Sequence, residues 1–483
     1  MNNTRYWFSF LFVLVLGLSA CQPATLRAIP DPTPPAPTAI PFPTATTAML
    51  ALTATGSSTS VRTCDYVPGQ SQPAQIPAGN AQPTGNPSPT PLVFSQAPQD
   101  ATTIANQMRL YDQIVKDITD HYYSTDYNGA DWSAIQAKYK LLIQNGLSQA
   151  DFYQAMQEMV NDLGDGVSEY SIPSDLATPT PTPPGNNFVG IGGVFYTLNQ
   201  NGQDKYILSW VYSGSPAEQA GIKNHDAILK VDGGPFLDAN GTPRSLGPAG
   251  STVTLTIQTP GQAPRDVQLV RHAISMTRVV DYCKVAGTAI GYMRWYDIDN
   301  SNTMDQTAEA LSRMSASAPL QGLILDLRRS DGYSELDNPQ ALVGLFTSGN
   351  LGSYVAPRKD SDPVAYTAAL SDIYGSQKIP IVVLQDQDTS GAALIAGVLQ
   401  LNGRARIVGQ TADGGSYDTF CDSYTDGSSL CVANEVFQPT GKTPDYWKKT
   451  AVVPDVLVNG CWDQYSEADD PYLAKAIDLL MQK

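Results

Sequence analysis

The feature that most limits how this chain can fold is a long N-terminal stretch rich in proline, threonine, alanine and serine, residues 22–100. Such a composition has too little apolar surface to offset the conformational entropy lost on folding. A second, shorter stretch of alternating proline and threonine spans residues 178–184. We therefore expect a disordered stalk over 22–100, a hinge at 178–184, and folded domains in the rest of the chain.

The first 21 residues have the layout of a secretory signal. One early charge, Arg5, precedes a mostly apolar stretch over residues 6–18, and two small residues precede Cys21. That stretch is shorter than the roughly 20 residues that a helix needs to span a bilayer. Residues 18–21 resemble the lipobox of bacterial lipoproteins, which implies a signal peptide over 1–21, a lipid on Cys21, and a chain anchored at the outer face of a bacterial membrane. The alternative is an uncleaved anchor helix, which also exports the chain.

Export permits disulfide bonds, because they persist outside the reducing cytoplasm. Cys421 and Cys431 bracket a short segment with a turn signal at Asp426–Gly427, so we predict that they join the two arms of a hairpin. Three further cysteines cannot all pair with one another, so at least one is free or bonded elsewhere: Cys64, Cys283 and Cys461.

Charge and histidine placement limit the partners. The chain has 46 acidic and 29 basic residues, a net charge of −17, which repels nucleic-acid phosphates. We therefore expect no nucleic-acid binding. The histidines are scattered singly, without the spacing of metal ligands, so we also predict no metal and no cofactor: His121, His225 and His272.

Residues 101–176 carry a helical pattern. Apolar residues recur at steps of three and four between Ile104 and Tyr122, which places them on one face of a helix. Ser148, three residues before Asp151, has the position of a helix N-cap. We expect an N-terminal helical segment.

A small β-rich domain is predicted over residues 186–272. Its signal is a set of short strand-like runs separated by glycine turns: residues 188–196, 205–211, 227–231 and 253–257.

Residues 273–483 are predicted to form an α/β core with a central sheet. Short apolar runs alternate with helical patterns here, as in βαβ units. The strand-like runs are residues 290–296, 322–328, 379–384 and 405–409, and the helical ones are 303–314 and 391–401. The whole chain is therefore expected to be a multidomain protein of the α/β and α+β classes.

Residues 214–222 and 226–233 closely resemble a PDZ domain. PDZ domains capture a C-terminal peptide by adding it as a strand to a sheet edge. The resemblance implies that Gly190, Ile191 and Gly192 form the loop that binds the peptide carboxylate. Taken alone, these glycines are equally consistent with an ordinary turn.

The chain from Ile104 to its end resembles the carboxyl-terminal processing, or tail-specific, proteases. The PDZ-like segment is one of the blocks that carry this resemblance. The others are Leu163-Gly164-Asp165, residues 322–328 with Gly332, residues 379–384 leading into 388–392, and Val453-Pro454-Asp455-Val456. The resemblance implies a serine peptidase that acts on exposed protein C-termini.

The resemblance places the nucleophile on Ser390, directly before the predicted helix 391–401. A helix N-terminus offers unpaired N–H groups and partial positive charge to an oxyanion, and Gly332 and Gly391 are the candidates for that region. The alternative is that Ser390 only caps the helix, as serine commonly does.

A serine hydroxyl needs a base to accept its proton. In this chain, other residues occupy the positions where the family has that base. Residues 410–416 contain no lysine where the family has it, and Val167 stands where some relatives have histidine. The loop after Arg328 also departs from the family pattern, with Ser330 and a single glycine, Gly332. Asp413, close to the position of the missing lysine, is a weak candidate base if it is desolvated.

Two functional hypotheses follow. The first is a serine endopeptidase that captures protein C-termini on a PDZ domain. The second is a catalytically impaired, protease-like lipoprotein that binds C-terminal peptides in the same groove. A purely structural surface spacer is a third, weaker alternative.

Overall fold

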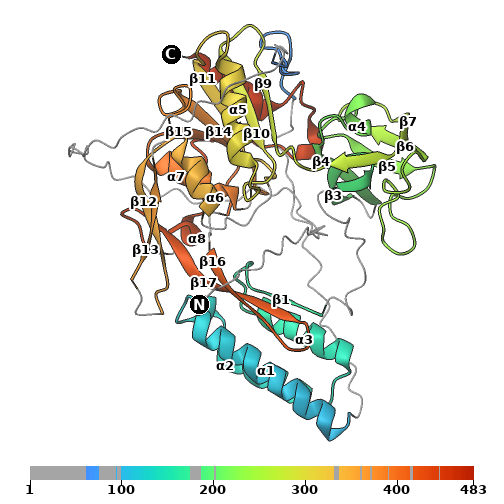
Figure 1. The fold of residues 1–483 in the computed structure, drawn as a ribbon, viewed down its shortest axis with the longest axis vertical. Coiled ribbons are helices and arrows are strands. Elements are labelled where there is room, and N and C mark those ends of the chain that lie inside the picture. The colour runs from blue at the N-terminus through green and yellow to red at the C-terminus, as the bar shows by residue number, and fades with distance from the viewer. Residues whose placement is uncertain are drawn as a thin grey trace, which may run out of the picture.

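The computed structural model describes residues 61–74, 94, 99–173, 187–200, 203–330, 337–358, 362–369, 372–389, 391–413, 417–444 and 446–482. They form an α/β lobe, a small β-rich lobe and a helical lobe (Figure 1). Cys21 and the rest of the predicted signal peptide lie outside the described residues. Among the described residues, no helix is long and apolar enough to cross a membrane.

The helical lobe contains the segment predicted to be helical. Asp100 caps its first helix by accepting from the Thr102 and Thr103 amides (2.8 and 3.0 Å), and Ser148 caps the third by accepting from the Asp151 amide (3.1 Å). The predicted cap at Ser148 is therefore confirmed. The elements are α1 (Ala101–His121), η1 (Tyr127–Gly129), α2 (Trp132–Gln144) and α3 (Gln149–Asn161).

A five-stranded antiparallel sheet joins the helical lobe to the α/β lobe. Its strands are β1 (Glu169–Ser171), β12 (Gly349–Val355), β13 (Val364–Ala368), β16 (Tyr417–Ser423) and β17 (Ser429–Pro439). Strand β17 runs from one lobe to the other, and the side chains of Leu430, Val432 and Ala433 belong to the core of the helical lobe (Figure 1). Cys421 and Cys431 lie opposite each other on β16 and β17, and the structure contains the predicted disulfide between them.

The α/β lobe is built on a six-stranded sheet of order β18-β15-β14-β11-β10-β9. The five strands from β10 to β18 are parallel, and β9 is an antiparallel edge. Residues of β11 and β14 are buried on both faces, which explains their continuous apolar runs. The strands are β9 (Val280–Lys284), β10 (Ile290–Trp295), β11 (Gly322–Asp326), β14 (Ile381–Gln385), β15 (Ala405–Gly409) and β18 (Val456–Leu457).

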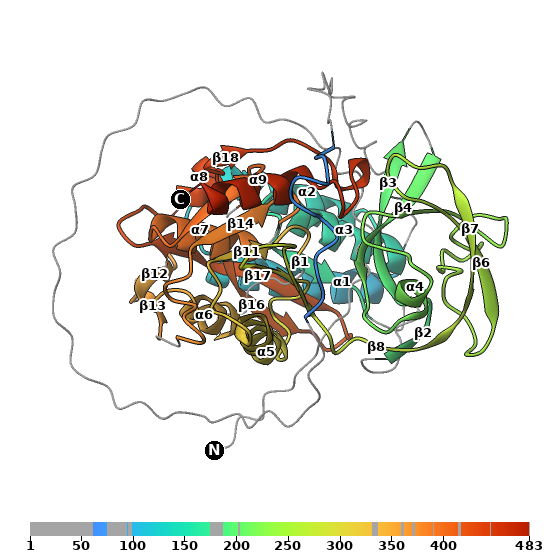
Figure 2. The same ribbon diagram turned by 90° about the horizontal axis from the view of Figure 1, so that it is seen from above.

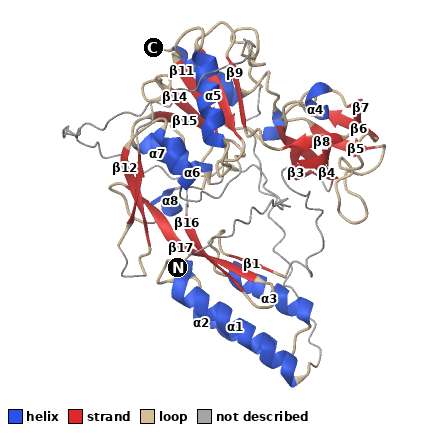
Figure 3. Cartoon of the chain, viewed as in Figure 1, coloured by secondary structure: helices blue, strands red, loops and turns tan. Residues whose placement is uncertain are grey.

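Helices cover both faces of this sheet (Figures 2 and 3). On one face, Leu323 and Leu325 of β11 share a core with α5, α6 and α7. On the other, Ile324 shares a core with α9. The mixed α/β architecture predicted from the sequence is confirmed. The helices are α5 (Thr303–Ser315), α6 (Asp337–Gly344), α7 (Ala392–Leu401), α8 (Tyr446–Thr450), η2 (Trp462–Gln464) and α9 (Pro471–Met481).

The β-rich lobe has a five-stranded sheet of order β3-β4-β5-β6-β7 and a separate pair, β2 and β8. Leu208, Ile228 and Leu255 are fully buried in its own small core. Strand β3 lies at the edge of the sheet, next to β4. The elements are β2 (Asn187–Gly190), β3 (Gly193–Gln200), β4 (Gln203–Val211), α4 (Pro216–Gln219), β5 (Ala227–Val231), β6 (Thr252–Gln258), β7 (Arg265–Val270) and β8 (His272–Ser275).

Residues 61–74 correct one prediction. They lie within the segment expected to be a disordered stalk, but Thr63 pairs with Lys284 at the outer edge of β9, and Cys64 forms a disulfide with Cys283. Proline-rich composition shows only that a segment has no core of its own. It does not exclude pairing with an existing sheet edge.

Arg328 follows β11 and is fully buried. Its guanidinium group pairs with Asp326 (2.6 Å) and with Asp470 (2.7 Å), and it also donates to the Tyr465 hydroxyl (3.0 Å). Asp470 in turn caps α9 by accepting from the Tyr472 amide (2.8 Å). The end of β11 is thereby tied to the start of α9.

We expect Arg328→Met to lower the free energy of unfolding of the α/β lobe by about 3–5 kcal/mol, because two carboxylates stay buried without their partner. Denaturant titration followed by tryptophan fluorescence measures the loss. Arg313→Met is the matched control, because Arg313 forms an exposed pair with Glu309 (2.7 Å) that is worth less than about 1 kcal/mol. Equal losses in the two variants would contradict the role given to Arg328.

Candidate functional site

The candidate site lies where the parallel strands of the α/β lobe end. The loops after β11, β14 and β15 meet at this edge of the sheet, the usual place for ligands in open α/β sheets. Ser390 and Gly332 lie outside the described residues. The structure describes Thr389 and Gly391, which flank Ser390 in the sequence.

Gly391 occupies the N-cap position of α7. Its backbone is helical (φ −53°, ψ −27°), and it makes no side-chain cap hydrogen bond. From Ala392 to Leu399 every residue of α7 is buried, so the surrounding core holds the helix in place. The amides of its first turn therefore have a fixed direction toward the end of β14.

A tight turn connects β14 to α7. The Thr389 hydroxyl donates to Asp386 Oδ1 (2.9 Å) and accepts from the Asp386 amide (2.9 Å). Burial raises the pKa of the Asp386 carboxyl, and the nearby Arg329 guanidinium opposes this shift. These contacts fix the backbone that leads to Ser390.

Arg329 links three parts of the structure. Its backbone is left-handed (φ +51°), and its guanidinium forms an ion pair with Asp388 (2.5 Å). The same group stacks over the ring of Tyr196 on β3, with 3.6 Å between Cζ and the ring centroid. The loop after β11, the turn after β14 and the β-rich lobe thus meet at one side chain.

The ends of β14 and β15 are fastened together by glutamine side chains and a glycine. The Gln410 amide donates to the Gln385 carbonyl (3.0 Å), and Gln385 Nε2 donates to the carbonyls of Gln410 and Val452 (both 2.8 Å). Gly409 adopts φ +142°, and a Cβ there would lie 1.8 Å from the Gln385 carbonyl oxygen. Only glycine fits this close approach.

A pocket opens beside these loops. Among the residues that the structure describes, its lining contains aspartates but no lysine or histidine. The aspartates of the turn are engaged, Asp386 by Thr389 and Asp388 by Arg329. The lining residues are Tyr196, Leu198, Arg329, Asp386, Gln387, Asp388, Gln410, Gly460, Cys461, Trp462 and Asp463.

The candidate base named from the sequence, Asp413, is not part of this lining. Asp413 is exposed to solvent, so it lacks the burial on which the base hypothesis depended. Lys448 is also exposed, and it contacts Asn128 and the Tyr123 hydroxyl (3.3 Å) of the helical lobe. Val167 contributes to the core of that lobe.

The predicted peptide-binding loop leads directly into β3. The Ile191 carbonyl accepts from the Ala217 amide of α4 (2.9 Å), and the Gly192 carbonyl accepts from the Tyr212 amide (3.0 Å). Gly192 has φ +88°, and a Cβ there would lie 2.2 Å from Ser215 Cβ. Close packing against α4 is therefore one reason for a glycine at this position.

No sequence pattern pairs Tyr196 with Arg329. Their contact joins residues far apart in the chain, on different lobes. Two successive arginines after a buried strand indicate only that each has a partner, because a charged side chain in such a position is usually paired.

Parts of the chain are similar to known peptidases. Residues 289–458 match the model of peptidase family S41, and residues 105–161 match the tricorn protease C1 domain. A carboxyl-terminal-processing protease of Synechocystis sp. is 26% identical over 404 residues, which cover 80% of this chain and 90% of that protein. A carboxy-terminal-processing protease of Bartonella bacilliformis is 31% identical over 255 residues, 50% of this chain and 56% of that protein.

The fold has a counterpart among solved structures. A putative S41 protease from Bacteroides fragilis aligns with 80% of this chain and 99% of its own, with a TM-score of 0.50 and 16% identity. This likeness concerns the fold alone.

We expect Gly409→Ala to lower the free energy of unfolding by about 3–5 kcal/mol, because the new Cβ forces the ends of β14 and β15 apart. Gly403→Ala is the control, since Gly403 also has a positive φ (+65°) but open space around it, and the backbone strain of a Cβ there costs about 1–2 kcal/mol. Denaturant titration compares the two. A loss at position 409 no larger than that at 403 would refute the close approach.

Proposed function

This chain belongs to the carboxyl-terminal-processing protease family, peptidase family S41, and from this premise we propose that it is a serine peptidase acting on the exposed C-termini of other proteins. Ser390 is the proposed nucleophile, and the β-rich lobe is the proposed PDZ domain that holds the tail.

The observation that carries the proposal is the turn between β14 and α7. In the sequence, Ser390 follows this turn after the buried parallel strand β14 and directly precedes Gly391, the N-cap residue of a buried helix. Amides at a helix N-terminus stabilise negative charge, which an acyl-transfer reaction develops on the carbonyl oxygen of its substrate. Gly391 supplies such a position, and Gly332 remains a proposed contributor.

The β-rich lobe supports the capture of a peptide tail. Its edge strand β3 pairs with β4, and β4 is the only strand beside it within the described part of the sheet. A peptide added antiparallel to β3 would place its C-terminus at the start of the strand, next to Gly190, Ile191 and Gly192. Tyr196 of β3 also lines the pocket beside the proposed nucleophile turn.

A second function, tail binding with impaired catalysis, is favoured by one specific observation. The described lining of the pocket offers no lysine or histidine, and its turn carboxylates already have partners. Loss of a general base typically slows such reactions by about 10²- to 10⁴-fold.

We also propose that the protein works outside the cytoplasm, held to a membrane through a lipid on Cys21. The disulfides Cys64–Cys283 and Cys421–Cys431 support an oxidising compartment. The membrane anchor itself rests on the sequence of the first 21 residues.

We expect the purified chain without its first 21 residues to fragment an unfolded protein that has an apolar C-terminal tail, and Ser390→Ala to abolish this fragmentation. Mass spectrometry of the products measures both. Ser301→Ala, in an exposed turn of the α/β lobe, is the control and should cut like the unaltered protein. Equal cutting by Ser390→Ala would eliminate Ser390 as nucleophile, and no cutting by any form would favour the binding function.

We expect the Ser390→Ala protein to bind a tail peptide with a free carboxylate about 10- to 100-fold more tightly than the same peptide with an amidated end. The reason is that hydrogen bonds to a charged group contribute about 1.5–3 kcal/mol. Fluorescence anisotropy of labelled peptides gives the two dissociation constants. Equal constants would exclude carboxylate capture under both proposed functions.

A further inference from the structure

Residues 61–74, here called the strap, pair with the edge of the α/β sheet through a single β bridge, Thr63 with Lys284. The Cys64 amide donates to the Lys284 carbonyl (3.0 Å), and the Lys284 amide donates to the Arg62 carbonyl (2.9 Å). At its far end the Ala74 amide donates to the Asp469 carbonyl (2.7 Å). The strap therefore lies across β9 and reaches the loop before α9.

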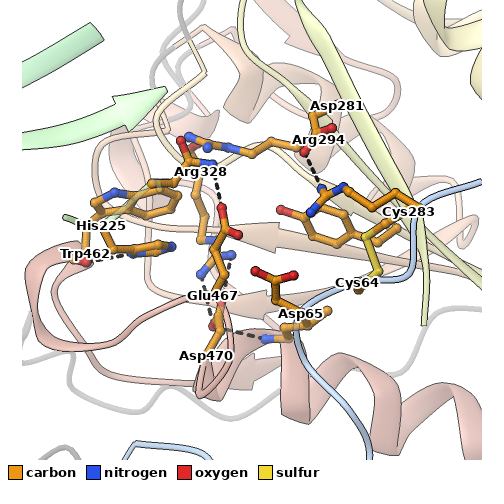
Figure 4. A pocket seen from close by; sticks show the side chains of 14 residues that line it. Cys64, Asp65, His225, Asp281, Cys283, Arg294, Arg328, Trp462, Glu467 and Asp470 are labelled. Atoms are coloured by element: carbon orange, nitrogen blue, oxygen red, sulfur yellow. Dashed lines mark hydrogen bonds and ion pairs between the residues drawn. A yellow bond between two sulfur atoms is a disulfide. The ribbon is translucent and has the colours of Figure 1, made fainter. Parts of the chain in front are cut away.

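A disulfide closes the strap onto β9. Cys64 and Cys283 are both buried, and their bond spans 219 positions of the chain (Figure 4). The covalent loop contains the whole helical segment and the β-rich lobe. Arg62 adds an ion pair with Asp281 of β9 (2.7 Å).

The strap also contacts the β-rich lobe. Asp65, next to the disulfide, forms an ion pair with Lys223, in the loop between α4 and β5. In the same loop, Asn224 Nδ2 donates to Glu467 Oε1 (2.8 Å) of the α/β lobe. One loop of the β-rich lobe is thus held from two sides, by the strap and by the segment before α9.

The next residue of this loop is buried at the junction. His225 stacks on Trp462, with 3.8 Å between ring centroids, and its Nδ1 lies 2.8 Å from the Trp462 carbonyl oxygen (Figure 4). Burial, with the charge of Arg328 nearby, lowers the pKa of His225, so the ring is neutral. Trp462 Nε1 donates to the Leu208 carbonyl (3.0 Å) of β4.

Arg294 completes the junction from β10. It donates to the Ser209 carbonyl (2.7 Å) of β4 and lies over the Trp462 ring, with 4.5 Å between Cζ and the centroid. These contacts are as buried as a domain core, whereas contacts between domains are usually more polar and allow relative motion. These contacts attach the β-rich lobe to the α/β lobe, and the strap adds the Asp65–Lys223 ion pair to them.

The links that attach the strap differ in strength. The ion pairs of Arg62 and Asp65 are partly exposed, and exposed pairs contribute little. The disulfide is the strong link, because it closes a very long loop and so restricts the conformations of the unfolded chain and of a detached strap. Without it, the part of the strap around Cys64 is retained by a short β bridge and weak ion pairs, while the far part keeps the buried ring of Tyr66 and the Ala74–Asp469 hydrogen bond.

We propose that the strap is a redox-sensitive clamp that locks the β-rich lobe onto the α/β lobe. A dithiol reductant breaks the Cys64–Cys283 bond, transferring two electrons and two protons so that two thiols form while the dithiol becomes a disulfide. The part of the strap around Cys64 then leaves β9, Asp65 leaves Lys223, and the loop at residues 223–225 loses the support of that ion pair. The reverse exchange, in which a small-molecule disulfide takes up the two electrons and two protons and becomes a dithiol, restores the clamp.

Hydrogen–deuterium exchange of the folded protein tests the clamp. In Cys64→Ser/Cys283→Ser, we expect exchange to rise about tenfold or more in the strap and also at residues 223–225 and in β4. Cys421→Ser/Cys431→Ser is the matched control, because it removes the other disulfide and should raise exchange only in β16 and β17. Lys223→Gln should raise exchange at 223–225 while β9 stays protected.

Faster exchange confined to the strap, with residues 223–225 and β4 unchanged, would overturn the proposal. The Cys64–Cys283 disulfide would then stabilise the strap alone. If the double variant does not fold, unaltered protein is titrated with dithiothreitol, and the reduced fraction is read from its mass. Exchange at 223–225 should rise in proportion to reduction of Cys64 and Cys283. Exchange that does not follow this fraction would equally refute the clamp.

Discussion

The structure depends on a buried charge cluster at the end of β11. Arg328 is surrounded by the carboxylates of Asp326 and Asp470 and by the rings of Trp462, Tyr465 and Tyr472. Burial alone would raise the pKa of Asp326, but the adjacent guanidinium outweighs it and holds that pKa below its usual range. A charge buried so deeply must stay paired, so the strand end, the start of α9 and the loop before it have to assemble together.

Much of the fold could be predicted from the sequence, because local sequence patterns indicate many of its elements. The apolar runs of β11 and β14 predicted the central sheet, and the cap at Ser148 predicted the start of a helix. The turn signal between Cys421 and Cys431 predicted their disulfide. Each of these signals lies within a few residues of the element that it predicts.

The junction between the lobes could not be predicted in this way. The strap has a composition that cannot build a core, and its fold comes from the edge of β9 and from Cys283, which lies 219 positions away from Cys64. The contact between Tyr196 and Arg329 is equally remote. Neither residue has a sequence neighbour that indicates its partner, so only the packed structure brings them together. The missing base is a different case, because the absence of lysine from residues 410–416 was visible in the sequence.

The junction also bears on the chemistry of the site. Arg329 contacts the ring of Tyr196 on the lobe proposed to hold a peptide, and it pairs with Asp388 in the turn that precedes α7. Its left-handed backbone is a costly conformation that persists only when its surroundings determine it. A displacement of the β-rich lobe would remove the ring from one face of Arg329 and change the support of Asp388. The position of the β-rich lobe and the geometry of the turn before α7 therefore depend on the same side chain.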